Sequence, residues 1–240
     1  LDEHLAELER RELVFRRRDS AIAGEVEYIF KQKLVRDVAY ANILKRQRVA
    51  YHREVARWLE AHRGGRWDDA LLGYHYAHGE APQEAVNALL RAGDVAAGYQ
   101  ALGEALADLD FAARLASEHT DLTLAVEWTD RLVPASAVIQ IARGGVYLAM
   151  GEHEKALAEL ARAEEAMGMF GHVAGTARCI TLKGEVLLAE AQHHKRLPRE
   201  DIGELAICAR DLAQAAGDDV AEFAARLLAG QHMLKRRGVT

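Results

Sequence analysis

The stretch "GGVYLAMGEHEKALAELARA" at residues 144–163 constrains the fold more than any other part of the 240-residue chain. Six positions carry a pattern of small and large residues: Gly144, Tyr147, Gly151, Ala156, Leu160 and Ala163. Small residues at 144 and 156 allow two antiparallel helices to approach closely, and Tyr147 fills the groove between them. Gly151 supplies the turn. The pattern predicts a helical hairpin.

These offsets resemble those of a tetratricopeptide repeat. The stretch departs from that family at Gln140, where a large apolar residue is common, and at Gly168, where a proline is common. An earlier copy keeps four of the offsets and departs at two, with Ala96 in place of the aromatic residue and Gln100 in place of the turn glycine. The four matching residues are Gly93, Ala105, Leu109 and Ala112.

A third copy around Gly184 and Ala206 needs about ten extra residues, which "HHKRLPRED" could hold as a longer loop. The aligned glycines are 51 and then 40 residues apart, instead of the ~34 of a regular repeat. We therefore predict degenerate tetratricopeptide-like α-hairpins forming a right-handed array. An extra short helix is expected near 122–132, and the last helix, 219–235, is expected to cap the array.

Composition agrees with a mainly α protein. Ala, Leu, Glu and Arg are abundant, and the chain has only 3 prolines and 6% aromatic residues. No apolar run approaches the ~20 residues that a membrane-spanning helix needs. Two cysteines, Cys179 and Cys208, do not make a disulfide framework, and we expect both to be buried thiols on consecutive helices. We expect a cytoplasmic protein, no membrane contact, and a fragment of something larger.

Charge divides the chain unevenly. Residues 1–63 carry 14 Lys and Arg against 11 Asp and Glu, a net charge of +3, and the remainder carries 17 against 26, a net charge of −9. The segment "HRGGRWDD" at 62–69 has paired glycines that break a helix and an aspartate that could cap the next one. We therefore predict two domains, 1–63 and 64–240.

The first domain is expected to contain a helix, a β-hairpin and two more helices. Residues 2–13 have helical periodicity, and "LVFRRRD" and "EVEYIFK" are β-prone runs separated by a turn at Gly24. From Leu34 the period becomes helical, and a further helix follows with Val49, Ala56 and Leu59. This order is the back half of a winged-helix arrangement, whose first helices would lie upstream of Leu1.

A known family has this combination. "EYIFKQKLVRDVAYANILKRQRVAYHREVARWLE" resembles the segment after the ATPase core of bacterial STAND-type signalling ATPases, most of all those attached to class III adenylate or guanylate cyclases, and next those attached to helix-turn-helix transcriptional activators. The resemblance covers roughly residues 1–118. It is carried by Phe30, Leu34, Asp37, Val38, Ala39, Tyr40 and Leu44.

The resemblance implies a winged-helix domain packed on a nucleotide-binding core, with a histidine that senses ADP. Gln32 stands at that position, and glutamine can donate a hydrogen bond to a phosphate oxygen but carries no charge. Gln32 could equally be an ordinary polar residue at a helix N-terminus. The chain contains no Gly-x4-Gly-Lys-Ser/Thr phosphate loop. We expect no cofactor in this chain, with ATP or ADP bound only in the parent's upstream domain.

Further groups of residues could bind a ligand or carry chemistry. Arg16, Arg17 and Arg18 lie on the proposed wing and could contact DNA phosphates, or could protect a strand edge by charge. The glutamates of the preceding helix disfavour nucleic acid. His75 and His78 could share a helical face, but no further ligand has metal-site spacing. No arrangement of catalytic residues stands out, so we expect no enzyme and no metal.

The inner face of the repeats is the expected partner-binding surface. A carboxylate clamp needs Lys and Asn there, and the corresponding residues do not supply them. The face instead looks apolar, which suits a packed helical partner or neighbouring domains of the same protein. Its residues are Leu90, Asp94, Ile141, Gly145 and Leu148. We expect a non-catalytic regulatory and protein-interaction module of a larger signalling ATPase, or alternatively a winged-helix DNA-binding regulator.

Overall fold

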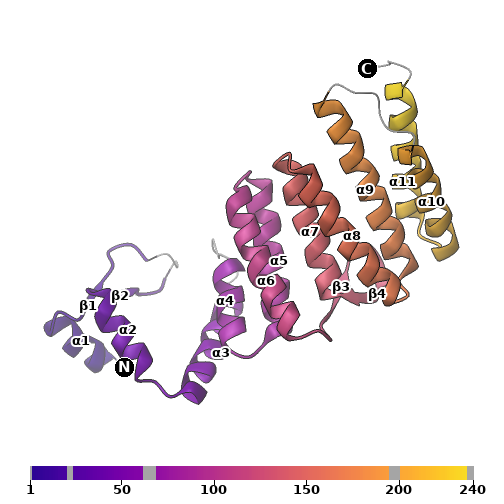
Figure 1. Cartoon of the computed structure of the whole chain (residues 1–240). Helices are drawn as coiled ribbons and strands as arrows, with labels where there is room; N and C mark the ends of the chain where they lie inside the picture. The colour runs from indigo at the N-terminus through magenta and orange to yellow at the C-terminus, as the bar shows by residue number, and fades with distance from the viewer. Residues whose placement is uncertain (1, 21–23, 62–68, 195–200, 237–240) are drawn as a thin grey trace. The chain divides into compact units, whose positions relative to one another are not determined.

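The computed structural model describes residues 2–20, 24–61, 69–194 and 201–236 (Figure 1). The chain is mainly helical and forms two compact units, Leu1–Ala81 and Pro82–Thr240, each of which is described by itself. The domain boundary expected at 63/64 lies outside the described residues. The helix that follows those residues, at 69–78, belongs to the first unit.

The first unit contains a helix, a two-stranded antiparallel hairpin and three further helices. Val14 pairs with Phe30 and Arg16 with Tyr28, so the predicted β-hairpin is confirmed. Its small core includes Ala56, Leu59 and Tyr76. The elements are α1 (Asp2–Arg10), β1 (Val14–Arg16), β2 (Tyr28–Phe30), α2 (Lys33–Ala41), α3 (Lys45–Ala61) and α4 (Asp69–His78).

The second unit is an array of helices with one inserted β-hairpin. Consecutive helices pack in antiparallel pairs, α5 on α6 and α7 on α8, and α9 packs on both α10 and α11. Figure 1 shows these helices side by side, from the α5–α6 pair to α10 and α11 at the other end. The elements are α5 (Pro82–Gly98), α6 (Leu102–Glu118), β3 (Thr123–Val126), β4 (Thr129–Pro134), α7 (Ala135–Ala149), α8 (His153–Met169), α9 (Val173–His193), α10 (Asp201–Ala216) and α11 (Asp219–Arg236).

Two glycines allow the first four helices of the array to approach in pairs. A Cβ atom on Gly144 would lie 3.1 Å from Leu160 Cγ, and one on Gly93 would lie 2.9 Å from Leu109 Cγ. Both contacts are tighter than side chains normally make, so a larger residue at either crossing would require the facing leucine to shift. Ala105, Ala112, Ala156 and Ala163 are fully buried beside them. The predicted close helix pairing, with its 51-residue spacing, is confirmed.

The turn after α7 closes with two backbone hydrogen bonds. The N–H of Gly151 donates to the carbonyl of Leu148, and the N–H of Glu152 donates to the carbonyl of Tyr147. This is a Schellman motif, which needs a left-handed residue, and Gly151 has φ +75°. The same pair of bonds follows α4, α5, α8 and α10, with positive φ at Glu80, Gln100, Gly171 and Gly217.

The segment expected to form a short helix near 122–132 is a β-hairpin, so that expectation was wrong. β3 and β4 are antiparallel, with Leu124 opposite Val133. Both side chains are fully buried, and β-branched residues on both strands suit a pleated, half-buried surface better than a helix. The base of the insert is closed by the N–H of Ala135, which donates to the carbonyl of Leu122 at 2.9 Å.

The third pair of helices departs from the first two. A Cβ atom on Gly184 would clash with Leu228 of α11, so this glycine serves the packing of α9 on α11. Ala206 on α10 is buried as expected. The longer loop predicted in this pair falls largely on residues 195–200, outside the described residues. α11 exposes Val220, Phe223 and Leu227 on its outer face, so its role as a cap stays a prediction.

The two cysteines do not share one environment. Cys179 on α9 is buried, and burial raises the pKa of its thiol to about 12. Cys208 on α10 is exposed, which corrects the expectation that both thiols are buried. None of the described helices combines the length and hydropathy needed to cross a membrane.

Candidate functional site

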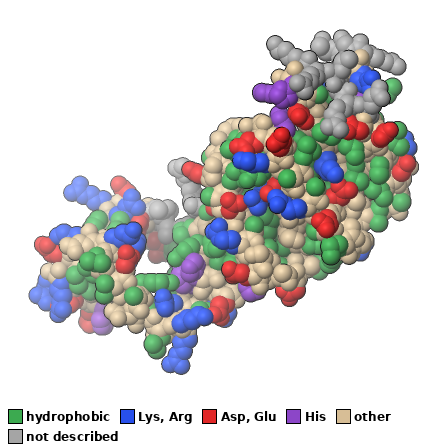
Figure 2. All heavy atoms as spheres, in the orientation of Figure 1, with side chains coloured by type: hydrophobic (Ala, Val, Ile, Leu, Met, Phe, Trp, Pro, Cys, Tyr) green, Lys and Arg blue, Asp and Glu red, His purple; other side chains and the backbone are tan. Residues whose placement is uncertain are grey.

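α2 is amphipathic, yet the structure buries none of its residues. Leu34 is 72% exposed and Val38 is 54% exposed, and Leu44, which follows the helix, is 58% exposed. Figure 2 shows hydrophobic side chains among charged ones on the surface of this unit, at the left of the view. The apolar residues on which the family resemblance rests therefore do not build the core of their own unit.

The neighbouring hairpin extends this apolar surface through Phe30 on β2, which is 37% exposed. Phe15 on β1 is 48% exposed but lies on the other face of the hairpin, because it pairs with Ile29 while Phe30 pairs with Val14. We call Phe30, Leu34, Val38 and Leu44 the α2 face. An exposed apolar set of this kind on a small unit is typical of an interaction surface.

Gln32 is the N-cap residue of α2. Its backbone is extended, with φ −128° and ψ 129°, and its exposed side chain makes no capping hydrogen bond. The side chain is therefore free to reach a ligand or solvent. This position agrees with both interpretations of Gln32, and no described neighbour distinguishes them.

The three arginines of the hairpin differ in their contacts. Arg17 forms an ion pair with Glu27 on the facing segment at 3.0 Å. The backbone N–H of Arg16 donates to the carboxylate of Glu9 in α1 at 3.1 Å. Acidic groups therefore lie against this hairpin on two sides. They weaken the positive electrostatic potential that a DNA phosphate would meet there.

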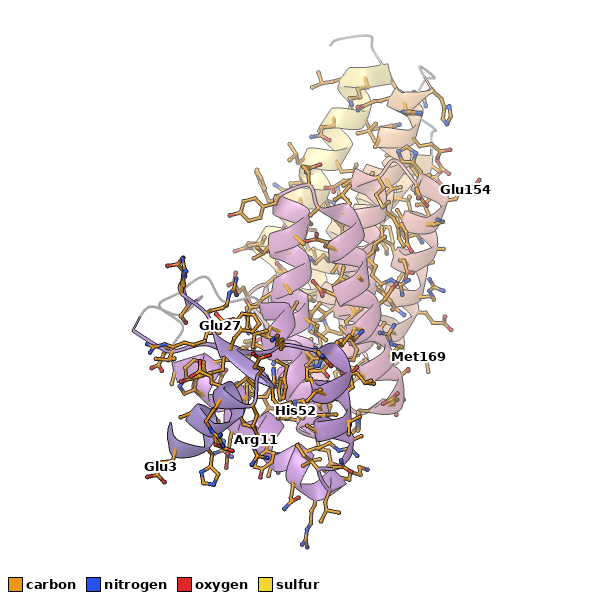
Figure 3. The ribbon with its side chains drawn as sticks, turned by 90° about the vertical axis from the view of Figure 1, so that its left-hand side faces the viewer. Glu3, Arg11, Glu27, His52, Glu154 and Met169 are labelled. Atoms are coloured by element: carbon orange, nitrogen blue, oxygen red, sulfur yellow. The ribbon has the colours of Figure 1, made fainter. Side chains whose placement is uncertain are left out.

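A chain of polar rings joins three helices of the first unit. The hydroxyl of Tyr40 on α2 lies 2.9 Å from Nε2 of His52 on α3, which Figure 3 labels. Nδ1 of His52 lies 3.1 Å from Nδ1 of His75 on α4. His78 adds a ring 5.1 Å from that of His52, centroid to centroid. His75 and His78 were noted in the sequence, whereas their partner His52 was missed because it lies on another helix.

The short distance between the two imidazoles restricts their protonation. Of the two facing Nδ1 atoms, one must carry the proton that it donates and the other must accept it. The two rings therefore cannot both be protonated at these facing atoms. Burial lowers the pKa of His75 to about 4, with His52 and His78 adding to the effect. Burial also lowers the pKa of His52. Both rings are thus neutral at pH 7, and they hold α2, α3 and α4 together through directional hydrogen bonds.

A cavity of about 370 Å³ opens beside this ring chain. The cavity is lined by Lys45 and Arg48 of α3 and by His78 of α4. Glu80 also lines it, and its carboxylate lies 4.0 Å from Nζ of Lys45. Arg48 lies over the ring of Tyr40 at 5.2 Å and forms no ion pair with the described residues. No group of three or more His, Cys, Asp or Glu within the described ranges is arranged to hold a metal ion.

The expected partner-binding residues of the array fall into two groups. Leu90 packs against the cluster around Ala105 and Leu109, and Ile141 and Leu148 pack against the matching cluster around Ala156. Asp94 and Gly145 are exposed. The structure therefore brings three of the five into the packing between helices, and leaves two at the surface.

Neither protein-family models nor curated proteins give a match to this chain.

Proposed function

We propose that this chain is a non-catalytic regulatory and protein-interaction module of a larger STAND-type signalling ATPase. The observation that carries the proposal is the exposure of the α2 face. Phe30, Leu34 and Val38 match the family pattern, and each is at least 37% exposed. Apolar residues that do not serve their own core are best explained by packing against another domain.

The second part of the proposal concerns the array. Its first two hairpins share tetratricopeptide offsets, close glycine contacts and the same turn bonds. Arrays of this kind present extended surfaces to helical or peptide partners. The array would bind a protein partner, or would hold the parent in an inactive state through its own neighbouring domains.

Gln32 lies beside the α2 face, at the start of the helix. In this proposal it occupies the place of the family's ADP-sensing histidine without its charge. Gln32→His in the parent protein should tighten ADP binding. Unchanged affinity in a calorimetric titration would leave Gln32 as an ordinary helix-start residue.

The test of the proposal has two arms. The reading frame around this chain should encode a phosphate loop within about one domain length, ~100–200 residues. The encoded ATPase domain should bind the isolated chain in calorimetry, and Leu34→Lys with Val38→Lys should abolish that binding. A reading frame without a phosphate loop would refute the proposal, and so would binding that is insensitive to the double substitution.

DNA binding through Arg16, Arg17 and Arg18 stays the alternative function. The ion pair between Arg17 and Glu27 weighs against it. Titration of a labelled duplex at several salt concentrations tests this alternative, because phosphate contacts make affinity fall steeply with salt. Absence of a salt slope would exclude phosphate contact by these arginines.

A further inference from the structure

The second hairpin of the array carries polar side chains where the first is apolar. The two hairpins match residue for residue at an offset of 51, as their helix bounds and turn bonds show. At three matched positions the first hairpin has an apolar residue and the second a polar one: Leu89 and Gln140, Ala92 and Arg143, Phe111 and Arg162. Gln140 is also the position where the sequence departs from the tetratricopeptide pattern.

These side chains surround one buried carboxylate. Glu159 on α8 is only 3% exposed. Its Oε1 forms ion pairs with Arg162 at 2.7 Å and with Arg143 at 3.2 Å, and Arg143 also lies 3.3 Å from Asp110 on α6. Both arginines therefore converge on a single oxygen of Glu159.

The second carboxylate oxygen has no partner. Oε2 of Glu159, Oε1 of Gln140 and Nε of Arg143 are buried, and none makes a hydrogen bond within the described part of the chain. A buried polar group that is left unpaired destabilises the fold. Two acceptors and one donor are thus unsatisfied at one place in the fold.

All three side chains line a cavity of about 320 Å³ between α6, α7 and α8. Its remaining walls mix apolar and polar side chains: Ala116, Leu122 and Ile139 lie among the apolar ones, and the polar ones are Ser117, His119, Thr120 and Ser136. The volume is at the lower end of the range for small-molecule sites. One end of the cavity is therefore polar and charged, while the apolar part of its walls suits a hydrocarbon group.

We propose that this cavity binds a small zwitterion of the α-amino-acid class with an apolar side chain. The ligand ammonium would donate to Oε2 of Glu159 and Oε1 of Gln140. The ligand carboxylate would accept from Nε of Arg143, with Arg162 adding positive charge. Small reorientations of the side-chain ends open these atoms to the ligand, and the apolar side chain lies against Ile139 and Leu122.

Ligands with one charged group fit less well. A carboxylate without an amine would leave the acceptors of Glu159 and Gln140 unpaired. An amine without a carboxylate would add a third positive charge beside Arg143 and Arg162 and leave Nε of Arg143 unpaired. This inference goes beyond the proposed function and does not depend on it, because the cavity is complete within the array.

The test is a titration of the 240-residue chain with L-leucine, followed by calorimetry and by thermal shift. Two probes each lack one charge: 4-methylpentanoate has no amine and 3-methylbutylamine has no carboxylate. We expect L-leucine to bind and to raise the melting temperature, and each single-charge probe to bind at least roughly tenfold more weakly. Absence of L-leucine binding at millimolar concentration overturns the proposal, as does equal binding of either probe.

Gln140→Leu supplies the variant, since Leu89 occupies the matched position of the first hairpin. It should weaken L-leucine binding at least roughly tenfold without unfolding the chain, which circular dichroism would check. Arg162→Gln should also weaken binding. Arg114→Gln is the control, because Arg114 lies on Phe111 outside the cavity. Unchanged affinity in both Gln140→Leu and Arg162→Gln, with both variants folded, overturns the proposal.

Discussion

The α5–α6 and α7–α8 hairpins have helices in the same register but differ in what fills them. α6 begins at Leu102 and α8 at His153, 51 residues later, and both helices have 17 residues. Figure 3 labels Glu154 and Met169 near the two ends of α8. The glycine–leucine crossings are alike in both hairpins. Glu159 matches Asp108 of the first hairpin, but Gln140, Arg143 and Arg162 around it match apolar residues there, so the backbone pairing and the interior chemistry are specified by separate positions.

The difference teaches which residues carry the pairing. Gly93 and Gly144 are equivalent in every contact that a Cβ would make, so the crossing depends on them and on the leucine opposite. Gln140 and Leu89 differ completely in polarity, while their helices end at matched residues, Gly98 and Ala149, and keep the same turn bonds. A position that tolerates such a change without altering the pairing is available for function.

The largest effect is expected from the ion-pair network of the second hairpin. Arg143→Ala should lower the free energy of unfolding by about 2–3 kcal/mol, because Glu159 keeps only Arg162 as partner in a buried place. In the double variant that combines Arg143→Ala with Glu159→Leu, most of the lost free energy of unfolding should be recovered. Urea denaturation would measure both variants, with exposed Arg114→Ala as the control at below about 0.5 kcal/mol. A loss as small as that of the control would mean that the network adds no stability.

Next come the two glycine crossings, which should respond alike. Gly93→Val and Gly144→Val should each cost about 1–3 kcal/mol, since the added methyl groups meet a leucine already in contact. Gly145→Ala is the control, because a Cβ there has open space and alanine favours a helix by ~1 kcal/mol. Thermal denaturation would show a fall for the first two variants and a rise for the third. A large difference between Gly93→Val and Gly144→Val would break the equivalence of the hairpins.

The histidines that follow the second helix of each hairpin should differ in what they add to the pH dependence of the free energy of unfolding. His172, which follows α8, caps α9 by accepting from the N–H of Gly175 at 2.9 Å, and it is 1% exposed. Burial and nearby Arg131 lower the pKa of His172. The capping contribution, about 1 kcal/mol, is therefore present above the unfolded value of ~6.5 and is lost as the pH falls below it.

His172→Ala should remove this part of the pH dependence between about pH 7 and 5. His119, which follows α6 in the first hairpin, is exposed, and His119→Ala is the matched control. Urea denaturation at a series of pH values measures both. A profile for His172→Ala that parallels the wild type would show that another group titrates.

The smallest effect is expected at the turns. Gln100 has φ +62° where the second hairpin has Gly151. Gln100→Gly should stabilise the chain by about 0.5–1 kcal/mol, because glycine adopts this conformation without strain, and Gly151→Gln should cost a similar amount. Opposite shifts in melting temperature would support this, whereas shifts of the same sign would contradict it.

Much of the fold follows from local pattern. The helices of both units, the first β-hairpin and the 51-residue match could be predicted, because small residues, turn residues and apolar periodicity specify them directly. Asp218 caps α11 locally, since its Oδ1 accepts from the N–H of Ala221 at 2.9 Å. These features depend on residues within one or two turns of one another.

What could not be predicted depends on distant residues. The β3–β4 hairpin lies between helices, and its strands contact α5 and α8, which are distant from it in sequence. His52 meets His75 across 23 positions of sequence. The cavity needs Gln140 and Glu159 on different helices, and only the departure at Gln140 gave a local signal.

The closure between Leu122 and Ala135 makes the β3–β4 insert a natural graft site. The chain leaves the array and returns to it at two residues joined by one hydrogen bond of 2.9 Å. A loop of another length that keeps the buried Leu124 and Val133 could therefore replace the rest of the insert without changing the phase of α7. Leu122 and Ala135 also line the cavity next to Arg143. Exchanging the loop here would thus alter the access of a ligand to the cavity without disturbing the helix pairing. The loop is therefore a place where the ligand selectivity of the cavity could be engineered.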